Sequence, residues 1–213
     1  HKIGEGHQNG IYEDPADKRR VFRVSKAFLN QNQGPVSEAQ RGSMAAITSF
    51  KAEAWDVMVS EFTGKGPRVP ALLIADGGAT YTDEGYPYII VDKIAGVSLD
   101  MKLKRMENSD WSLLEDFFRD SIDNGYILGE LKPSSLMNGT PYAGGLRQTW
   151  VVDAQSYKKS LTLKGAQIAE NILQRLVYFQ DTWGKEYERV RGIVATIRDE
   201  LLAQEKKEGS SGE

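Results

Sequence analysis

The sequence contains no cysteine and only two histidines, His1 and His7. Disulfide bonds, thiolate zinc sites and cysteine nucleophiles are therefore excluded, and a histidine-rich metal site cannot form. A metal ion would have to be bound through oxygen atoms of carboxylates, hydroxyls or amides. The chemistry of any site must accordingly be sought among oxygen-bearing and cationic side chains.

The chain also lacks a strong charge of one sign and a long apolar run. Its 27 Lys and Arg residues stand against 30 Asp and Glu residues, a formal net charge of −3, so neither nucleic acid nor an anionic membrane is an expected partner. Hydrophobic residues make up 40% of the sequence, but no stretch approaches a membrane span and the first residues do not form a signal peptide. We expect a soluble monomer that binds a nucleotide or a protein.

The first part of the chain is predicted to be rich in β-structure. Residues 3–12 have the pattern strand, glycine turn, strand, and 20–24, 70–75 and 88–91 are further short strand patterns. Residues 44–62 follow helical spacing. These patterns predict a small sheet of about five strands accompanied by one helix.

Helices are predicted from Ser98 onward. They are expected over 99–106, over 111–124 with Ser109 and Asp110 as cap, and over about 164–182 and 185–205, with Gly184 as the break between the last two. Residues 207–213 contain glycine and serine and are expected to be a flexible tail. Together with the β-rich first part, this order predicts an α+β fold class.

The most informative motif is the run Leu128-Gly129-Glu130-Leu131-Lys132-Pro133, followed by Ser135. A short apolar strand pattern, Val151-Val152, then leads to a second carboxylate, Asp153. A carboxylate, a Leu-Lys-Pro turn and a carboxylate at a strand end resemble the catalytic loop and the metal-binding strand of protein kinases. Residues 141–145 between them are expected to form a hairpin.

This resemblance implies roles for four residues. Glu130 would accept the proton of the substrate hydroxyl, and Lys132 would place a cation near the transferred phosphate. Asp153 and Ser135 would bind Mg²⁺ through oxygen atoms.

The motif also departs from the family pattern. The family's His-Arg-Asp is Leu128-Gly129-Glu130, its asparagine is Ser135, and its Asp-Phe-Gly is Asp153-Ala154-Gln155. The extra methylene of Glu130 displaces the carboxylate by about 1 Å, a misplacement that can cost about 10²-fold in rate. Asn138 could replace Ser135 as a metal ligand only if the loop were rearranged.

The first strands resemble the phosphate-covering hairpin of the same family. Gly4, Gly6 and Gly10 would let backbone amides approach phosphate oxygens, with Asn9 at the position of the family's third glycine. Arg23 stands where the family has a lysine, and it keeps the charge with a different hydrogen-bonding geometry. The alternative interpretation of Arg23 is a solvent-exposed residue at a sheet edge.

Three further residues complete the resemblance. Glu53, on the predicted helix, would be the acidic partner of Arg23, with Glu61 as the alternative. Val91 would line the back of the nucleotide pocket, and Asp92 would open the hinge. The implied architecture is a bilobal protein-kinase-like fold: N-lobe 1–91, hinge 92–97, reduced helical C-lobe 98–206 and tail 207–213. The implied cofactors are ATP and Mg²⁺.

The short second lobe is similar to that of minimal effector kinases that bacteria secrete into host cells. This narrower resemblance implies secretion by bacteria, action in the host cytoplasm and a host chaperone or signalling protein as substrate. A pseudokinase that binds a partner with little or no phosphoryl transfer is the alternative, because several catalytic positions are altered. A small-molecule phosphotransferase or nucleotidyl transferase on the same fold is a third possibility.

Overall fold

The structure is a computed structural model that describes residues 1–5, 9–25, 37–39, 42–43, 46, 80–81, 87–142, 144–152 and 157–210. The chain divides into two compact units. The first comprises His1–Glu61, Val69–Ala95 and Thr140–Leu146, and the second comprises Phe62–Arg68, Gly96–Gly139 and Arg147–Glu213. The predicted strand 70–75 lies outside the described residues, and so does the predicted helix 44–62 apart from Ala46.

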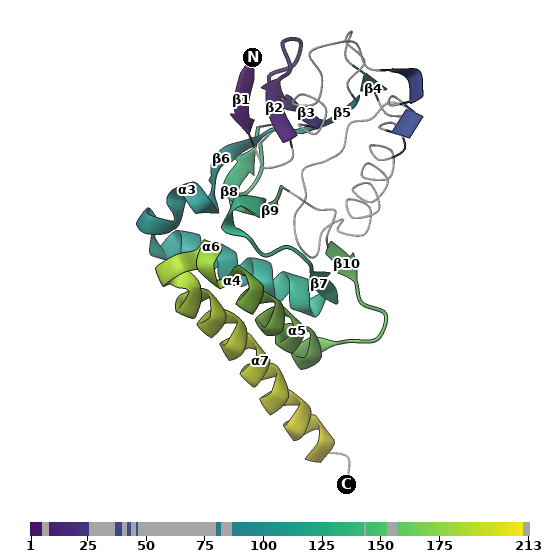
Figure 1. Cartoon of the computed structure of the whole chain (residues 1–213). Coiled ribbons are helices and arrows are strands. Elements are labelled where there is room, and N and C mark those ends of the chain that lie inside the picture. The colour runs from purple at the N-terminus through teal and green to yellow at the C-terminus, as the bar shows by residue number, and fades with distance from the viewer. Residues whose placement is uncertain are drawn as a thin grey trace. The chain divides into compact units, whose positions relative to one another are not determined.

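The first unit contains a five-stranded antiparallel sheet in the order β1-β2-β3-β5-β4 (Figure 1). Its strands are β1 Lys2–Glu5, β2 Asn9–Glu13, β3 Arg20–Ser25, β4 Thr80–Tyr81 and β5 Pro87–Asp92. The strands predicted over 3–12, 20–24 and 88–91 are confirmed. Short β-branched and aromatic runs separated by polar turns account for them, because such runs suit a pleated sheet with one covered face.

The second unit contains a two-stranded sheet, the larger part of a three-stranded sheet and most of the described helices. β7 Tyr126–Leu128 pairs with β10 Tyr157–Lys159. β6 Ile94–Ser98, β8 Leu136–Pro141 and β9 Gln148–Val151 form a three-stranded sheet in the order β6-β8-β9. The antiparallel pairing of β8 with β9 confirms the hairpin expected at 141–145.

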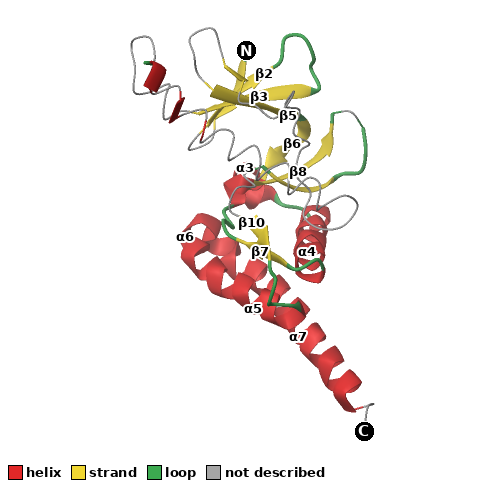
Figure 2. Cartoon of the chain, turned by 90° about the vertical axis from the view of Figure 1, so that its right-hand side faces the viewer, coloured by secondary structure: helices red, strands yellow, loops and turns green. Residues whose placement is uncertain are grey.

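The helical segments of this unit are α3 Leu99–Lys102, α4 Asn108–Asp123, α5 Gly165–Leu176, α6 Gln180–Trp183 and α7 Tyr187–Ser210, with 3-10 turns η1 Leu103–Arg105, η2 Pro133–Ser135, η4 Val177–Phe179 and η5 Gly184–Glu186. α5 packs along α7, and β7 packs against both α4 and α5 (Figure 2). No helix in the described ranges is long and apolar enough to cross a membrane.

The core of the second unit follows from helical periodicity. On α4 the buried apolar residues are Trp111, Leu114, Phe117, Phe118 and Ile122, and on α5 they are Ala166, Ile168, Ala169, Ile172, Leu173 and Leu176. Both sets recur at three- and four-residue spacing, so each forms one stripe. Burial of each large side chain in such a stripe contributes about 1.5–3 kcal/mol.

Two helix ends differ in detail from the sequence-based expectation, and one break agrees with it. α4 begins at Asn108 with Glu107 as N-cap, two residues before the predicted position, while Asp110 takes part in the capping by accepting a hydrogen bond from the Glu107 N–H at 3.1 Å. Gly184 has a φ of +54° and separates α6 from α7, as predicted. α7 continues to Ser210, beyond the predicted end near 205, because the charged residues 205–208 are good helix formers.

Candidate functional site

The loop from Gly129 to Lys132 joins β7 to η2 and carries the predicted catalytic side chains. The Lys132 ammonium donates a hydrogen bond to the Glu130 carboxylate, and the two groups form an ion pair. Their side chains are partly exposed, 24% for Glu130 and 39% for Lys132. The loop therefore holds a proton acceptor and a cation together where solvent can reach both.

The backbone of this loop is held by two aromatic residues for which the sequence did not predict this role. The Tyr157 hydroxyl donates to the Glu130 carbonyl at 2.9 Å, and the Trp183 Nε1 donates to the Leu131 carbonyl at 2.7 Å. The Leu131 side chain is completely buried. The only available signal in the sequence was that buried tyrosine and tryptophan normally find a hydrogen-bond partner.

Ser135, the predicted metal ligand, closes the loop at the end of η2. It is 5% exposed, and its N–H donates to the Lys132 carbonyl at 3.0 Å. The Val152 N–H in turn donates to the Ser135 carbonyl at 2.9 Å, one residue beyond the paired Leu136 and Val151. Asp153 itself lies outside the described residues, and Val152 is the last described residue before it.

Asn138, considered as a replacement for Ser135 in metal binding, already has other hydrogen-bond partners. It is 3% exposed, its Nδ2 donates to the Asp110 carboxylate at 3.1 Å, and its Oδ1 accepts from the Thr149 hydroxyl at 2.7 Å. Both ends of the amide are thus occupied by structural partners. The proposal that Asn138 replaces Ser135 is not supported, because the amide would have to break two buried hydrogen bonds.

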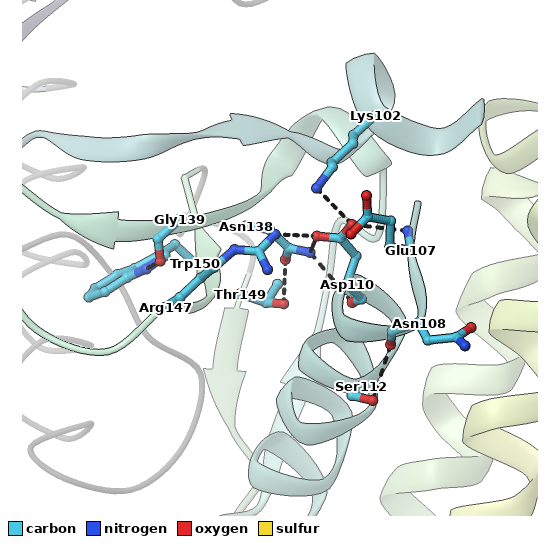
Figure 3. Close-up of polar contacts among 10 residues, drawn as sticks. All are labelled: Lys102, Glu107, Asn108, Asp110, Ser112, Asn138, Gly139, Arg147, Thr149 and Trp150. Atoms are coloured by element: carbon cyan, nitrogen blue, oxygen red, sulfur yellow. Dashed lines mark hydrogen bonds and ion pairs between the residues drawn. The ribbon is translucent and has the colours of Figure 1, made fainter. Parts of the chain in front are cut away.

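Asp110, in the first turn of α4, is the centre of a buried polar network (Figure 3). Lys102 at the end of α3 forms an ion pair with its carboxylate at 2.7 Å, and Arg147 just before β9 forms a second. Asn138 on β8 and the backbone N–H of Glu107, at 3.1 Å, complete its partners. The network therefore joins α3, α4 and the β8–β9 hairpin through one carboxylate.

The ionisation of Asp110 reflects these contacts. Burial alone would raise the pKa of this carboxyl, but hydrogen bonds from Lys102, the Glu107 N–H and Asn138 outweigh it and lower the pKa from the ordinary 3.8 to about 2. Asp110 therefore stays ionised in the folded state at any pH near neutrality.

Acid titration should show this contribution to stability. The pKa of Asp110 in the folded protein lies below its ordinary value of 3.8. The stabilisation is therefore fully present from about one pH unit above 3.8, and it is lost as the pH falls toward about 2. The loss should be on the order of 1–2 kcal/mol, since a tenfold change in the ionisation equilibrium is worth about 1.4 kcal/mol. Urea unfolding at pH 5 and pH 2.5 measures this loss. The parent protein should lose more unfolding free energy between the two pH values than Asp110→Asn does.

Asp116→Asn, on the exposed face of the same helix, is the matched control. It should unfold with the same pH dependence as the parent. An Asp110→Asn protein that loses as much stability on acidification as the parent would contradict the assignment.

In the first unit, Arg23 lies on a central strand and not at a sheet edge. β3 is paired on both sides, with Arg23 opposite Ile11 of β2 and Ile89 of β5. Directly opposite residues of antiparallel strands share a face, so Arg23 lies on the face of Ile89, which is 7% exposed. The interpretation of Arg23 as a solvent-exposed edge residue is therefore wrong.

The glycines of the hairpin are only partly described. Gly4 pairs with Ile11, and Gly10 pairs with Glu5 and Val24. A Cβ at Gly10 would lie 2.9 Å from the Tyr12 ring, so a larger residue there would need the Tyr12 side chain to shift. Gly6 lies outside the described residues.

Val91 and Asp92 lie at the end of β5, opposite Val21 and Arg20 respectively. Val91 is 3% exposed, and Asp92 is half-buried. Glu53 lies outside the described residues. The first-unit sheet thus brings together Gly4, Gly10, Arg23, Val91 and Asp92, whereas Glu130, Lys132 and Ser135 gather on one loop of the second unit.

No protein-family model matches the chain, and no curated protein matches it in sequence. Solved structures do resemble it. APH(2")-IIia in complex with GDP and kanamycin has a TM-score of 0.54 at 11% identity, over 95% of this chain and 79% of that one. The Rio2 kinase of Chaetomium thermophilum, in an ADP/Mg²⁺-phosphoaspartate complex, has a TM-score of 0.50 at 10% identity, over 97% of this chain and 70% of that one. The chain therefore has the protein-kinase-like fold that its motifs predicted.

Proposed function

We propose that this chain is an ATP- and Mg²⁺-dependent protein kinase that transfers a phosphoryl group to a protein hydroxyl. The observation that carries the proposal is the pair of Glu130 and Lys132, held in contact on the loop between β7 and η2. A carboxylate that can accept a proton and a cation that can neutralise phosphate charge are the groups that phosphoryl transfer requires. The likeness to solved kinases supports the fold in which such a loop works.

In this proposal Glu130 orients the acceptor hydroxyl and takes its proton, while Lys132 contacts the transferred phosphate. Ser135 and Asp153 would hold Mg²⁺, and the donor set fits that ion because it consists of carboxylate and hydroxyl oxygens. When bound, Mg²⁺ would neutralise charge on the nucleotide phosphates. In the first unit, Arg23 with Glu53 would hold the phosphates, Gly4, Gly6 and Gly10 would cover them, and Val91 and Asp92 would contact the base.

The pseudokinase alternative rests on a specific observation. Asn138, the nearest amide to the altered Ser135 position in sequence, is bound to Asp110 and Thr149. A single hydroxyl is then left where the family places an amide, which weakens a metal site. On this alternative, the chain binds nucleotide or a partner protein and transfers little phosphate.

A small-molecule acceptor is the second alternative. Its support is the likeness to APH(2")-IIia, whose structure contains GDP and kanamycin. Because that likeness is at 11% identity, it bears on the fold and leaves the acceptor open.

Incubation of the purified chain with labelled ATP or GTP and Mg²⁺ separates these functions. Label on a protein acceptor supports the proposal, and label on an aminoglycoside supports the small-molecule alternative. A thermal shift with nucleotide but no label on either acceptor supports the pseudokinase. We also propose a host chaperone or signalling protein as acceptor after secretion by bacteria, and label on such a protein in a host-cell lysate would test this.

Restoring the family residues should raise the rate. The triple variant Arg23→Lys, Glu130→Asp, Ser135→Asn is expected to transfer phosphate about 10²-fold faster than the parent, because it corrects a carboxylate displaced by about 1 Å. Initial rates at saturating ATP and Mg²⁺ measure the change. If the triple variant binds nucleotide but is no faster than the parent, the assignment of these positions is wrong.

A further inference from the structure

Two consecutive carbonyls of the loop accept hydrogen bonds from side chains that are distant in sequence. The Glu130 carbonyl accepts from the Tyr157 hydroxyl at 2.9 Å, and the Leu131 carbonyl accepts from Trp183 Nε1 at 2.7 Å. The two peptide planes held in this way lie between the Glu130 and Lys132 side chains. Any rotation of either plane would move these two groups relative to each other.

Both donors are buried. Tyr157 is 5% exposed and Trp183 is 1% exposed, so packing confines each ring while a single polar atom reaches the loop. Tyr157 lies on β10, whose residue 157 pairs with Leu128 immediately before the loop. Trp183 ends α6, next to Gly184 with its φ of +54°.

The loop has further contacts among the described residues, including the Lys132 ammonium, which lies 5.9 Å from the centre of the Phe179 ring. Leu131 is buried, and the Lys132 carbonyl accepts from the Ser135 N–H at 3.0 Å, but the Glu130 and Lys132 side chains are partly exposed. Exposed side chains on a loop are positioned mainly by their backbone. The two aromatic donors therefore supply a restraint that the ion pair alone does not.

We propose that Tyr157 and Trp183 are positioning residues, which fix the loop backbone so that Glu130 and Lys132 keep a productive arrangement. This inference rests on the proposed function and identifies which residues outside the loop it depends on. Neither side chain needs to contact substrate or nucleotide. Their effect is on placement, to which phosphoryl transfer is sensitive at the level of about 1 Å.

The test removes each hydrogen bond and keeps an aromatic ring at each position. Tyr157→Phe deletes the hydroxyl, and Trp183→Phe deletes the indole N–H. Trp150→Phe is the matched control, because Trp150 is also buried, at 8% exposed, and its Nε1 donates to the carbonyl of Gly139 at 2.9 Å, outside the loop. Steady-state kcat and nucleotide KM are measured for all three variants.

We expect kcat to fall about tenfold in Tyr157→Phe and in Trp183→Phe, and further in the double variant, since a shift of 1 Å costs about 10²-fold. Nucleotide KM should change less than about threefold, because neither residue binds nucleotide. The control Trp150→Phe should keep the kcat of the parent, even if its melting temperature falls as much as those of the two test variants. Equal losses of kcat in Trp150→Phe and Trp183→Phe would overturn the proposal, as would an unchanged kcat in both test variants.

Amide hydrogen exchange provides a readout that does not need activity. Residues 130–136 should exchange faster in Tyr157→Phe and Trp183→Phe than in the parent, and should be unchanged in Trp150→Phe. If the parent transfers no phosphate but the exchange difference is present, the proposed function is wrong, while the role of Tyr157 and Trp183 in fixing the loop backbone is retained. If the parent is active but exchange in the loop is the same in all variants, Tyr157 and Trp183 do not fix the loop backbone.

Discussion

Replacing Glu130 with glutamine is expected to lower the rate of phosphoryl transfer by about 10²–10⁴-fold, the usual contribution of a general base. Glutamine has nearly the same shape, and its carbonyl can still accept the hydrogen bond that Lys132 donates to the carboxylate. It cannot, however, take a proton from the acceptor hydroxyl. Nucleotide affinity, measured by calorimetry, should therefore stay within about threefold of the parent while the initial rate collapses.

Glu188→Gln is the matched control for this change. Glu188 lies on α7, its side chain is 75% exposed, and its ion pair with Arg191 spans 3.7 Å, so its loss should leave both rate and stability nearly unchanged. A Glu130→Gln protein that transfers phosphate as fast as the parent would remove Glu130 from the mechanism. The carboxylate would then be a partner of Lys132 only.

Replacing Gly96 with alanine is expected to destabilise the second unit by about 3 kcal/mol or more. A Cβ at position 96 would lie 2.3 Å from the Asn138 carbonyl oxygen and 2.7 Å from the Gly139 Cα. These are backbone atoms of β8, and both residues are paired with β9, Asn138 with Thr149 and Gly139 with Gln148. Because the strand cannot yield without breaking that pairing, the urea midpoint should fall sharply or the protein should not fold.

Gly192→Ala is the control, and its effect should have the opposite sign. Gly192 lies on α7, and a Cβ there would meet nothing within 4 Å. Alanine in a helix interior is favoured over glycine by about 1 kcal/mol, so the urea midpoint should rise slightly. A Gly96→Ala protein as stable as the parent would show that β6 and β8 do not approach each other this closely.

Gly96 also illustrates what sequence patterns can and cannot explain. It lies within residues 92–97, which were interpreted from the sequence as the hinge. The structure places Gly96 within strand β6, where the close approach of β8 requires a glycine. The requirement for glycine at position 96 comes from a strand about 40 residues further along the chain, and the assignment of 92–97 as a hinge stays a prediction.

The elements that the sequence predicted well are those governed by local periodicity. The strand around Arg23 and the apolar stripe of α4 could be inferred because alternation and helical spacing depend only on neighbouring residues. The loop carrying Glu130 and Lys132 could be found because the residues of its motif are adjacent in the chain. The cap of α4 was misplaced by a few residues, since several polar side chains at 107–110 can serve that role.

Residues whose roles depend on distant partners could not be inferred in this way. Asp110 was interpreted as a helix cap, but besides accepting from the Glu107 N–H it binds Lys102, Arg147 and Asn138 in a buried network that the sequence did not reveal. Trp183 gave no sign that its indole would reach Leu131, which is 52 residues away in sequence. Such contacts arise when separate elements pack, so no window of local sequence contains them.

By itself, the sequence determined the α+β order of elements, the oxygen-based chemistry available to any metal site and the loop on which a carboxylate and an ammonium are two residues apart. Only the tertiary structure decided that Arg23 lies on a central strand, that Asn138 is unavailable to a metal, and that Tyr157 and Trp183 hold the loop. The physical reason is range: propensity and periodicity act over a few residues, whereas buried hydrogen bonds form only after distant segments have been brought together.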